Sequence, residues 1–415
     1  MLDFFINLFG IIPMSMAISV AIIMVTFLMW ILGWSWEKRL KIPDPYQVKK
    51  SPKVSVVIAS YKSAKTIRET IESVMRSDYK KKEIIVIDDT PDESVVEALR
   101  GLDVKIVRHK KRLGKAKSMN LALKGFKTDL FLFLDSDSII DKKFISCIVP
   151  WFRDKKVGAV SPKYNTRNRN GFLGRFTSLE ASFWFTLART HMFFGSMVSF
   201  RGCGIMVSGS AFRKVGMWDE TLVEDMALAG KLLTRGYKIL HDPRVTVYTD
   251  EPESWKELYR QRFRWGKGGL FSFLRNIRAY ITAPQIIYGM IPHAILVVAL
   301  FFFIIRNSIL ALLVMWPLFE LSALTPIILI ELGTVIALLF SVYWIPATLA
   351  TFVHSILFSF KGMRSLSEVL LLIPYILIFL PVLFGIYALG ILAGIKERIK
   401  FGSKVDEMNF KDWKK

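Results

Sequence analysis

Two aspartates separated by one residue, Asp135 and Asp137, follow an apolar run that begins at Leu130. Side chains two apart on a β-strand face the same side, so both carboxylates can approach one ion. Mg²⁺ is usually held by one or two carboxylates together with substrate phosphates, and such a metal neutralises a diphosphate leaving group. A DxD triplet by itself is often a solvated turn, but its position at the end of a buried strand favours a metal site.

A second acidic pair, Glu224 and Asp225, lies at the start of a helical pattern. A carboxylate within hydrogen-bond reach of an acceptor hydroxyl can take its proton as the hydroxyl attacks. Acidic residues are also favoured at helix starts by capping and by the helix dipole. The pair alone therefore leaves a catalytic and a structural interpretation open.

Two basic segments complete the set of residues that could do chemistry. In QRFRW, residues 261–265, arginines alternate with aromatic residues. Arginine binds phosphate bidentately and tryptophan stacks on sugar faces, although a basic helix at a membrane surface has the same composition. In KRLGKAKSMN, residues 111–120, a glycine precedes a helix start and two lysines, which resembles a generic anion cradle. The pattern lacks the Gly-Lys-Ser/Thr ending of a phosphate loop, which disfavours a P-loop NTPase.

The elements that must position these residues alternate between strands and helices. Apolar β-branched runs predict strands at 54–60, 83–89, 104–109 and 130–138, and a helix is expected at 64–77. Such alternation favours a doubly wound sheet of nucleotide-binding type, in which ligands bind beyond the carboxyl ends of the strands. The acidic residues Asp88, Asp89, Asp135 and Asp137 all fall at predicted strand ends.

Composition points to a membrane protein. The 415 residues are 52% hydrophobic, with a formal charge of +22 and a mean hydropathy of +0.37. No nucleic-acid motif accompanies the charge, so we expect no nucleic-acid partner. Neither the two cysteines nor the five scattered histidines have the spacing of a metal site or a disulfide framework.

Long apolar stretches predict membrane spans. Residues 12–34 carry no charge and precede basic residues, which places the following segment in the cytoplasm by the positive-inside rule. Further spans are expected near 285–305, 308–330, 332–357 and 367–395, although one of these could lie in the interface or re-enter the membrane. Two aromatic stretches, 182–200 and 270–280, are expected to be interfacial helices, with packing against the catalytic core as the alternative.

In chain order the segments IASYKSAKTIRETIES, VIDD, RLGKAKSMNLAL, LDSDS, RGCGIMVSGSAFRKVG, VEDMALAGKLLTRGYK and TDEPESWKELYRQRFRW resemble the family-2 membrane glycosyltransferases. These are inverting GT-A enzymes that include the hyaluronan, cellulose and chitin synthases and small capsular polysaccharide synthases. The resemblance runs from about residue 52 to 265. It implies an α/β GT-A (Rossmann-like) cytoplasmic domain plus an α-helical transmembrane region, and an inverting UDP-sugar-dependent hexosyltransferase that uses Mg²⁺ or Mn²⁺.

The resemblance also implies roles for individual residues. Asp225 would be the general base with Glu224 beside it, and Asp135 and Asp137 would bind the metal. The donor would be bound by Ala59, Tyr61, Asp88, Asp89, Lys115, Asp135, Ser136 and Arg264. The acceptor would be bound by Gly202, Cys203, Gly204, Gln261 and Trp265.

Some features depart from the family pattern. Val223 precedes the acidic pair where the family usually has threonine, and Lys62-Ser63 replaces the usual Asn-Glu. No cellulose-synthase-type gating loop with an FxVTxKG pattern is present, which disfavours cellulose synthase. The expected division is an N-terminal transmembrane helix (1–36), the GT-A domain (52–268), an interfacial helix (269–283), a transmembrane region (284–396) and a cytoplasmic tail (397–415).

These expectations favour a processive β-glycosyltransferase of the cell membrane, a polysaccharide synthase that extends a glycan from a UDP-sugar and translocates it. Transfer of a single sugar to a lipid acceptor, such as a polyprenyl phosphate or a glycolipid, stays as the alternative. A non-enzymatic scaffold with a degenerate transferase domain is disfavoured by the complete DSD, ED and QRFRW sets.

Overall fold

The computed structural model describes residues 51–109, 111–284 and 374–402, with single positions between 24 and 44 and at 286 and 371. The chain divides into two compact units. One unit comprises residues 1–35 and 284–381. The other comprises residues 36–283 and 382–415, and it contains all of the predicted site residues. The predicted spans at 12–34, 285–305, 308–330 and 332–357, and the tail beyond 402, lie essentially outside the described residues.

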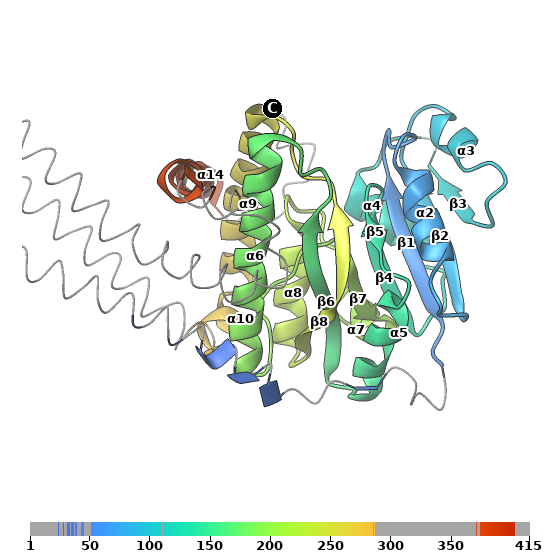
Figure 1. Ribbon diagram of the computed structural model, residues 1–415, viewed down its shortest axis with the longest axis horizontal. Helices are drawn as coiled ribbons and strands as arrows, with labels where there is room; N and C mark the ends of the chain where they lie inside the picture. The colour runs from blue at the N-terminus through green and yellow to red at the C-terminus, as the bar shows by residue number, and fades with distance from the viewer. Residues whose placement is uncertain are drawn as a thin grey trace, which may run out of the picture. The chain divides into compact units, whose positions relative to one another are not determined.

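One half of an eight-stranded sheet is parallel (Figure 1). β1 (Val54–Ser60) lies between β2 (Lys82–Asp88) and β4 (Leu130–Asp135), and β3 (Lys105–Arg108) forms the edge beside β2. These strands are nearly continuous apolar runs, because parallel strands are covered on both faces. Helices α2 (Ile67–Met75), α3 (Ser94–Ala98) and α4 (Lys115–Leu123) make the connections. The carboxyl ends of β1, β2 and β4 therefore meet at one edge.

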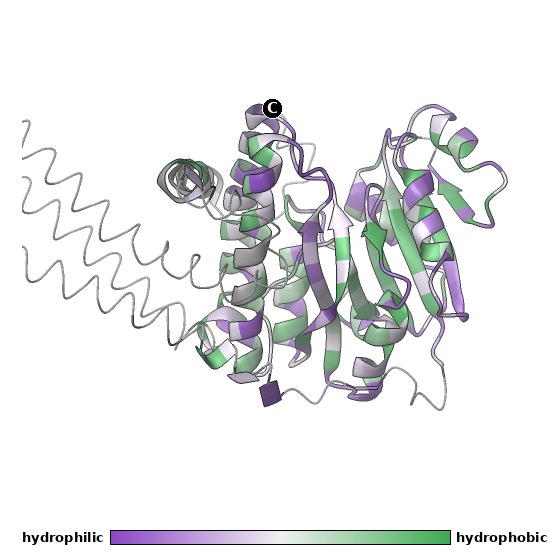
Figure 2. Ribbon diagram, viewed as in Figure 1, coloured by the Kyte–Doolittle hydropathy of each residue, from purple (hydrophilic) through white to green (hydrophobic). Residues whose placement is uncertain are grey.

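The other half of the sheet is mixed. β7 (Ile205–Ser208) pairs antiparallel with β4 and with β6 (Val157–Thr166), and β6 pairs parallel with β8 (Lys238–Thr249). The short β5 (Ile139–Ile140) closes the order β3-β2-β1-β4-β7-β6-β8-β5. Figure 2 shows much of β1 and β4 as hydrophobic, whereas the C-terminal part of β6 is hydrophilic. The core is built around the apolar strand residues.

The remaining helices surround this sheet. They are α5 (Phe144–Ile148), η2 (Val149–Arg153), α6 (Gly171–Phe193), α7 (Gly209–Lys214), α8 (Glu224–Thr234), α9 (Trp255–Arg275) and α10 (Ile277–Ile281). Near the C-terminus lie η5 (Tyr375–Phe379) and α14 (Leu380–Phe401). A capping box formed by Ser254 and Glu257 fixes the start of α9, the helix that carries QRFRW.

The predicted strand–helix alternation is confirmed, but several boundaries differ. The strand expected at 130–138 ends at Asp135, because the chain turns there, and the helix expected at 64–77 spans only 67–75. The boundary predicted at residue 268 lies inside α9, since the Ser254 cap starts one continuous helix that ends at Arg275. The stretch 182–200 is largely α6, whose Arg189 and His191 are buried. The burial of these two side chains supports the alternative that this stretch packs against the core of the catalytic domain, and not the expected interfacial helix.

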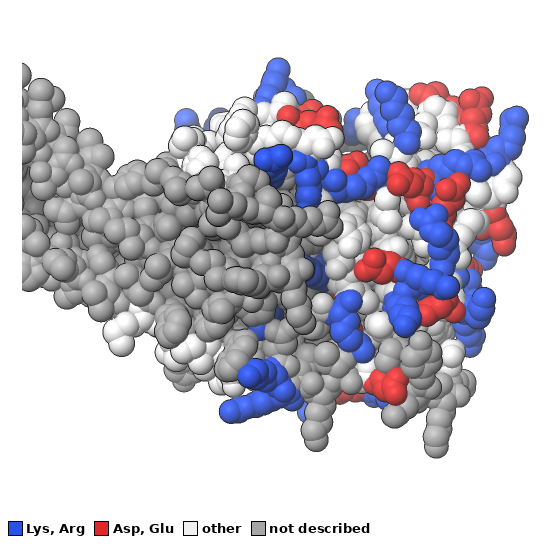
Figure 3. All heavy atoms as spheres, viewed as in Figure 1, with Lys and Arg blue, Asp and Glu red and all other residues white. Residues whose placement is uncertain are grey.

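Basic and acidic side chains are interspersed over the face of the second unit that Figure 3 shows.

Both cysteines, Cys147 and Cys203, are free and buried. Among the described helices, none combines the length and the apolar composition needed for a membrane span.

Helix α14 packs closely on α9. A Cβ placed on Gly266 would lie 2.5 Å from the carbonyl oxygen of Tyr387, and one on Gly390 would meet the carbonyl oxygen of Phe263. Lys267 and Glu397 form an ion pair across the same seam. The glycines allow the two backbones to touch, so α14 closes one side of the region around QRFRW.

Gly266→Ala is therefore expected to destabilise the protein by about 1–3 kcal/mol, because the new methyl group collides with backbone that cannot move independently. The thermal unfolding midpoint in detergent measures the effect. Gly385→Ala on α14 is the matched control, since a Cβ at that position meets nothing within 4 Å. Equal midpoints for the two variants would contradict the close packing of α9 and α14.

Candidate functional site

A cavity of about 870 Å³ lies in the second unit, beyond the carboxyl ends of β1 and β4. Its lining comes from segments far apart in the sequence: the ends of the parallel strands, the loop before α4, the start of α8, the middle and C-terminal half of α9 and part of α14. Most of the predicted site residues line it: Ala59, Tyr61, Asp89, Lys115, Asp135, Asp137, Gly202, Cys203, Glu224, Asp225, Gln261, Arg264 and Trp265.

Three of the predicted residues are absent from the lining. Asp88 is fully buried, where it pairs with Arg108 at 3.2 Å and accepts the backbone N–H of Thr90. Gly204 adopts a φ of +73° beside Pro162 and Val247, so its role here is to let the backbone pass close to both side chains. Ser136, between the two aspartates, also lies outside the lining, in the turn that follows β4.

One end of the cavity offers a flat, polar platform. The Arg112 guanidinium lies 4.0 Å from the centroid of the Tyr61 ring, which is 39% exposed. The carboxylate of Asp89 accepts the backbone N–H groups of Leu113 and Gly114, at 2.7–3.1 Å. Asp89 thus shapes the loop that carries Lys115, while the exposed Tyr61 ring can stack on a planar base.

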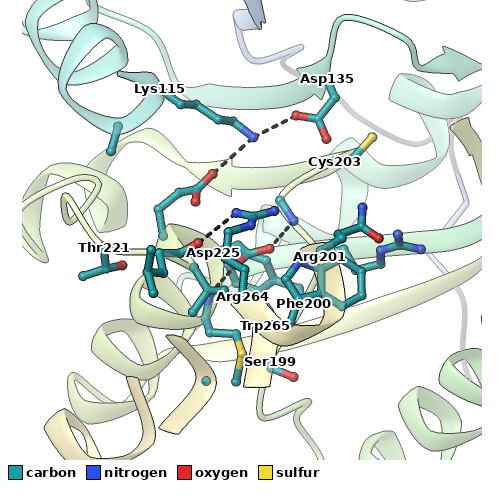
Figure 4. Close-up of a pocket in the computed structure, with 18 of the residues that line it drawn as sticks. Lys115, Asp135, Ser199, Phe200, Arg201, Cys203, Thr221, Asp225, Arg264 and Trp265 are labelled. Atoms are coloured by element: carbon teal, nitrogen blue, oxygen red, sulfur yellow. Dashed lines mark hydrogen bonds and ion pairs between the residues drawn. The ribbon is translucent and has the colours of Figure 1, made fainter. Parts of the chain in front are cut away.

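A lysine bridges the two acidic motifs (Figure 4). Lys115 Nζ lies 2.8 Å from Asp135 Oδ1 and 3.2 Å from Glu224 Oε1. Burial opposes its charge, but the two carboxylates dominate and raise the pKa of Lys115. Burial alone would raise the pKa of Asp135, but the charge of the Lys115 ammonium outweighs it and the pKa is lowered. The end of β4 and the start of α8 therefore share one cation.

Among the residues that the structure describes, no lysine or arginine pairs with the second aspartate of the triplet. Burial, together with the charges of Asp135 and Asp250, raises the pKa of Asp137 to about 6. Within the described residues no cluster of three or more His, Cys, Asp or Glu side chains forms a complete metal site. The donor set nevertheless fits Mg²⁺ or Mn²⁺, because these ions take one or two carboxylates and complete their shells with substrate phosphates and water. A cation beside Asp137 would also offset the acidic charge gathered there.

Asp225 is held by backbone donors in the first turn of α8. Its Oδ2 accepts the N–H of Gly202 at 2.8 Å, and its Oδ1 accepts the N–H of Met226 at 2.8 Å. Burial and the neighbouring charge of Glu224 raise the pKa of Asp225 to about 6. A carboxylate with that pKa is ionised at neutral pH and still basic enough to accept a proton.

The wall around Asp225 is formed by the 199–203 segment and α9 (Figure 4). Arg264 donates to the carbonyl oxygen of Leu222 at 2.9 Å, which ties α9 to the segment before Asp225. Cys203 Sγ lies 2.9 Å from Ser138 Oγ, and burial, with the charge of Asp135, raises the pKa of its thiol to about 12. The protonated thiol suits a pocket lining rather than a nucleophile.

The position of Trp265 depends on a buried network of charges. Arg262, 1% exposed, donates to Glu180 at 2.6 Å and to Glu251 at 3.2 Å. Arg201 donates to the other oxygen of Glu251 at 2.6 Å. The two guanidinium carbons, of Arg262 and Arg201, lie 4.2 and 5.4 Å from the centroid of the Trp265 ring. The network joins α6, the segment after β8 and α9 beside one indole.

Sequence analysis did not assign a role to Arg201, Arg112 or Asp250, all of which line the cavity. Arg112 and Arg201 lie within the motif segments RLGKAKSMNLAL and RGCGIMVSGSAFRKVG, so membership of those segments was the available signal. Asp250 follows β8 directly and had no comparable motif.

The mixed sheet, with an acidic DxD motif at the end of a central strand, defines a GT-A type α/β domain. A mannosyltransferase from Pyrobaculum calidifontis, solved with GDP-Man and Mn²⁺, superposes with a TM-score of 0.59 at 18% identity, covering 86% of this chain and all of the other. That likeness supports the fold alone. Residues 55–216 match the family model Glycosyl transferase family 2, so this part of the chain is a family-2 glycosyltransferase domain.

The curated relatives include polysaccharide synthases. The chain is 30% identical over 246 residues to the poly-beta-1,6-N-acetyl-D-glucosamine synthase of Staphylococcus aureus, and the match covers 56% of this chain and 60% of the relative. The Staphylococcus epidermidis enzyme of the same name is 29% identical over 240 residues, covering 56% and 58%. The match thus spans less than two thirds of the length of each relative.

Proposed function

We propose that the protein is a membrane-embedded processive β-glycosyltransferase, a polysaccharide synthase that transfers N-acetylglucosamine from UDP-N-acetylglucosamine to a growing glycan. The catalytic domain would lie in the cytoplasm, and the segments outside the described residues would carry the glycan across the cell membrane. The similarity to the two staphylococcal synthases supports the donor and the polymeric product.

One observation carries the proposal. The DxD aspartates, Asp225 and Trp265 line a single cavity, although 130 positions separate the first of them from the last. A volume of about 870 Å³ lies within the range of pockets that enclose ligands of drug size or larger. The cavity therefore has room for a nucleotide sugar and the end of an acceptor together.

The geometry supports a single displacement at the sugar. The base would stack on Tyr61, and Lys115 and Arg264 would hold the diphosphate. The acceptor sugar would stack on Trp265, which brings its hydroxyl toward Asp225. The acceptor oxygen would then bond to the anomeric carbon as the bond to the diphosphate breaks on the opposite face, and Asp225 would take the hydroxyl proton. This sequence inverts the anomeric configuration and releases UDP.

Asp135 and Asp137 would hold Mg²⁺ or Mn²⁺, which supplies positive charge against the departing diphosphate. The protein itself orients the two substrates: the Asp89-bound loop presents Lys115, and the Gly202 N–H aims the Asp225 carboxylate.

The proposal is tested by sizing the products of detergent-purified protein incubated with each UDP-sugar and a divalent metal. A polymer from UDP-N-acetylglucosamine that disappears on chelation is the expected result. A product extended by only one sugar on a lipid would keep the catalytic assignment and replace the polymerase with a lipid glycosyltransferase. Absence of UDP release with every donor would remove the enzymatic function.

The raised pKa of Asp225 predicts an acid limit to turnover. With its pKa at about 6, the carboxylate is ionised above that pH and loses its basicity by protonation below it. At saturating donor and metal, kcat is expected to be level from pH 7 to 8 and to fall about tenfold per unit well below pH 6. A flat profile between pH 5 and 8 would contradict a titrating base at this position.

A further inference from the structure

The cavity continues beyond Trp265 along one face of α6. Trp184, Leu187, Ala188 and His191 line it, and their spacing places them on one stripe of the helix. The stripe runs for about 10 Å along the helix axis. Exposure falls from 38% at Trp184 to 3% at His191, so this part of the cavity has an open mouth at Trp184 and a deep end at His191.

A second histidine reaches the same cavity from the sheet. His241 of β8 is 1% exposed and lies opposite Ser161 in the register with β6. Within the described part of the chain, Nε2 of His191 has no hydrogen-bond partner, and neither ring nitrogen of His241 makes a well-formed hydrogen bond, although the Ser161 backbone lies close enough to act on the pKa of His241. Buried polar atoms normally have partners, because an unmade hydrogen bond costs about 1–3 kcal/mol. These three nitrogens therefore indicate a missing polar ligand.

The two imidazoles are uncharged at neutral pH. Burial lowers the pKa of His191 to about 4 and has the same effect on His241. A neutral imidazole both donates and accepts a hydrogen bond. The rings of His241 and Phe185 form a T-shaped contact with their centroids 5.3 Å apart. Lys163 Nζ, from the neighbouring strand β6, lies 5.1 Å from the Phe185 ring centroid. The surroundings are thus aromatic and hydrogen-bonding, which suits a hydroxyl-rich ligand.

We propose that this part of the cavity is a second acceptor subsite, which takes an uncharged sugar unit distal to the one stacked on Trp265. Trp184 supplies a stacking face at the mouth, and His191 and His241 exchange hydrogen bonds with hydroxyl or acetamido groups at the deep end. The subsite rests on the proposed function, since it assumes a glycan acceptor, and it makes the enzyme bind a chain more tightly than a single sugar.

The test is calorimetric binding to the full chain in detergent, with UDP and Mn²⁺ present. The probes are N-acetylglucosamine and its pentasaccharide, and the variants are His191→Phe and His241→Phe. The pentasaccharide is expected to bind the wild type more tightly than the monosaccharide does. Each variant should lose about tenfold in pentasaccharide affinity, the value of one hydrogen bond, with unchanged affinity for UDP and the monosaccharide.

Phe193→Leu, on the exposed side of α6, is the control that should leave all affinities unchanged. His241→Asn keeps a hydrogen-bonding group and should recover part of the loss, which separates ligand binding from a folding defect. Wild-type protein that binds both sugars equally, or phenylalanine variants that keep the pentasaccharide affinity, would overturn the subsite. The calorimetric assay measures binding and involves no turnover, so it tests the subsite alone. A failure of the proposed polymerase function would show up in the product-sizing assay instead.

Discussion

Asp225→Asn is expected to lower kcat by about 10²- to 10⁴-fold while leaving UDP binding unchanged. General base catalysis contributes on this scale, and the amide cannot accept the hydroxyl proton. The fold should tolerate the change, because the asparagine carbonyl oxygen can still accept the Gly202 N–H that Asp225 accepts at 2.8 Å. Steady-state UDP release and calorimetric UDP binding give the two quantities.

Two further variants sharpen this result. Asp154→Asn makes the same chemical change at a half-exposed residue that pairs only loosely with Lys238 at 3.9 Å, so it should keep full activity. Glu224→Gln should weaken the grip on Lys115, which lies 3.2 Å away, and should act mainly on the donor KM. If Asp225→Asn keeps more than a tenth of wild-type kcat while Glu224→Gln abolishes turnover, the base is Glu224.

Arg262→Met is expected to destabilise the protein by about 3–5 kcal/mol, the usual cost of removing one partner from a buried ion pair. Glu180, 4% exposed, would keep only the indole N–H of Trp184 at 3.4 Å among its described hydrogen bonds. Trp265 would also lose the guanidinium 4.2 Å from its ring. The thermal midpoint should fall, and the acceptor KM should rise in whatever fraction stays folded.

A double variant distinguishes lost charge balance from lost packing. Glu180→Gln combined with Arg262→Met removes the uncompensated carboxylate and should recover part of the thermal midpoint. Arg175→Met removes an exposed arginine from the same helix, α6, and should leave stability and acceptor KM unchanged. An Arg262→Met protein with the wild-type midpoint and acceptor KM would show that the buried network neither stabilises the fold nor positions Trp265.

The sequence was sufficient for features that depend on local periodicity. Apolar runs of strand length predicted β1, β2, β3 and β4, and the period of two predicted that Asp135 and Asp137 share a side. Both aspartates do line the cavity, but β4 ends at Asp135, so the turn after the strand, and not the strand period, places Asp137 there. The ordered motifs predicted family-2 membership, which the family match to residues 55–216 confirms. The catalytic and binding roles of individual residues stay predictions.

Local pattern could not decide between neighbours whose environments differ only in three dimensions. Asp88 and Asp89 are adjacent, yet one is buried against Arg108 and the other holds the loop before Lys115. A strand end points successive side chains to opposite faces, and which face holds the ligand depends on the helices that cover the other.

The sequence alone thus indicated the fold class, the family of residues 55–216 and most of the predicted site residues that line the cavity, because these are encoded in short apolar and acidic patterns. Only the tertiary structure decided which distant charges meet. Arg262 pairs with Glu180, 82 positions away, and His241 lines the same cavity as His191, which belongs to another element. Burial and long-range packing set these partners, and neither leaves a periodic signal in the chain.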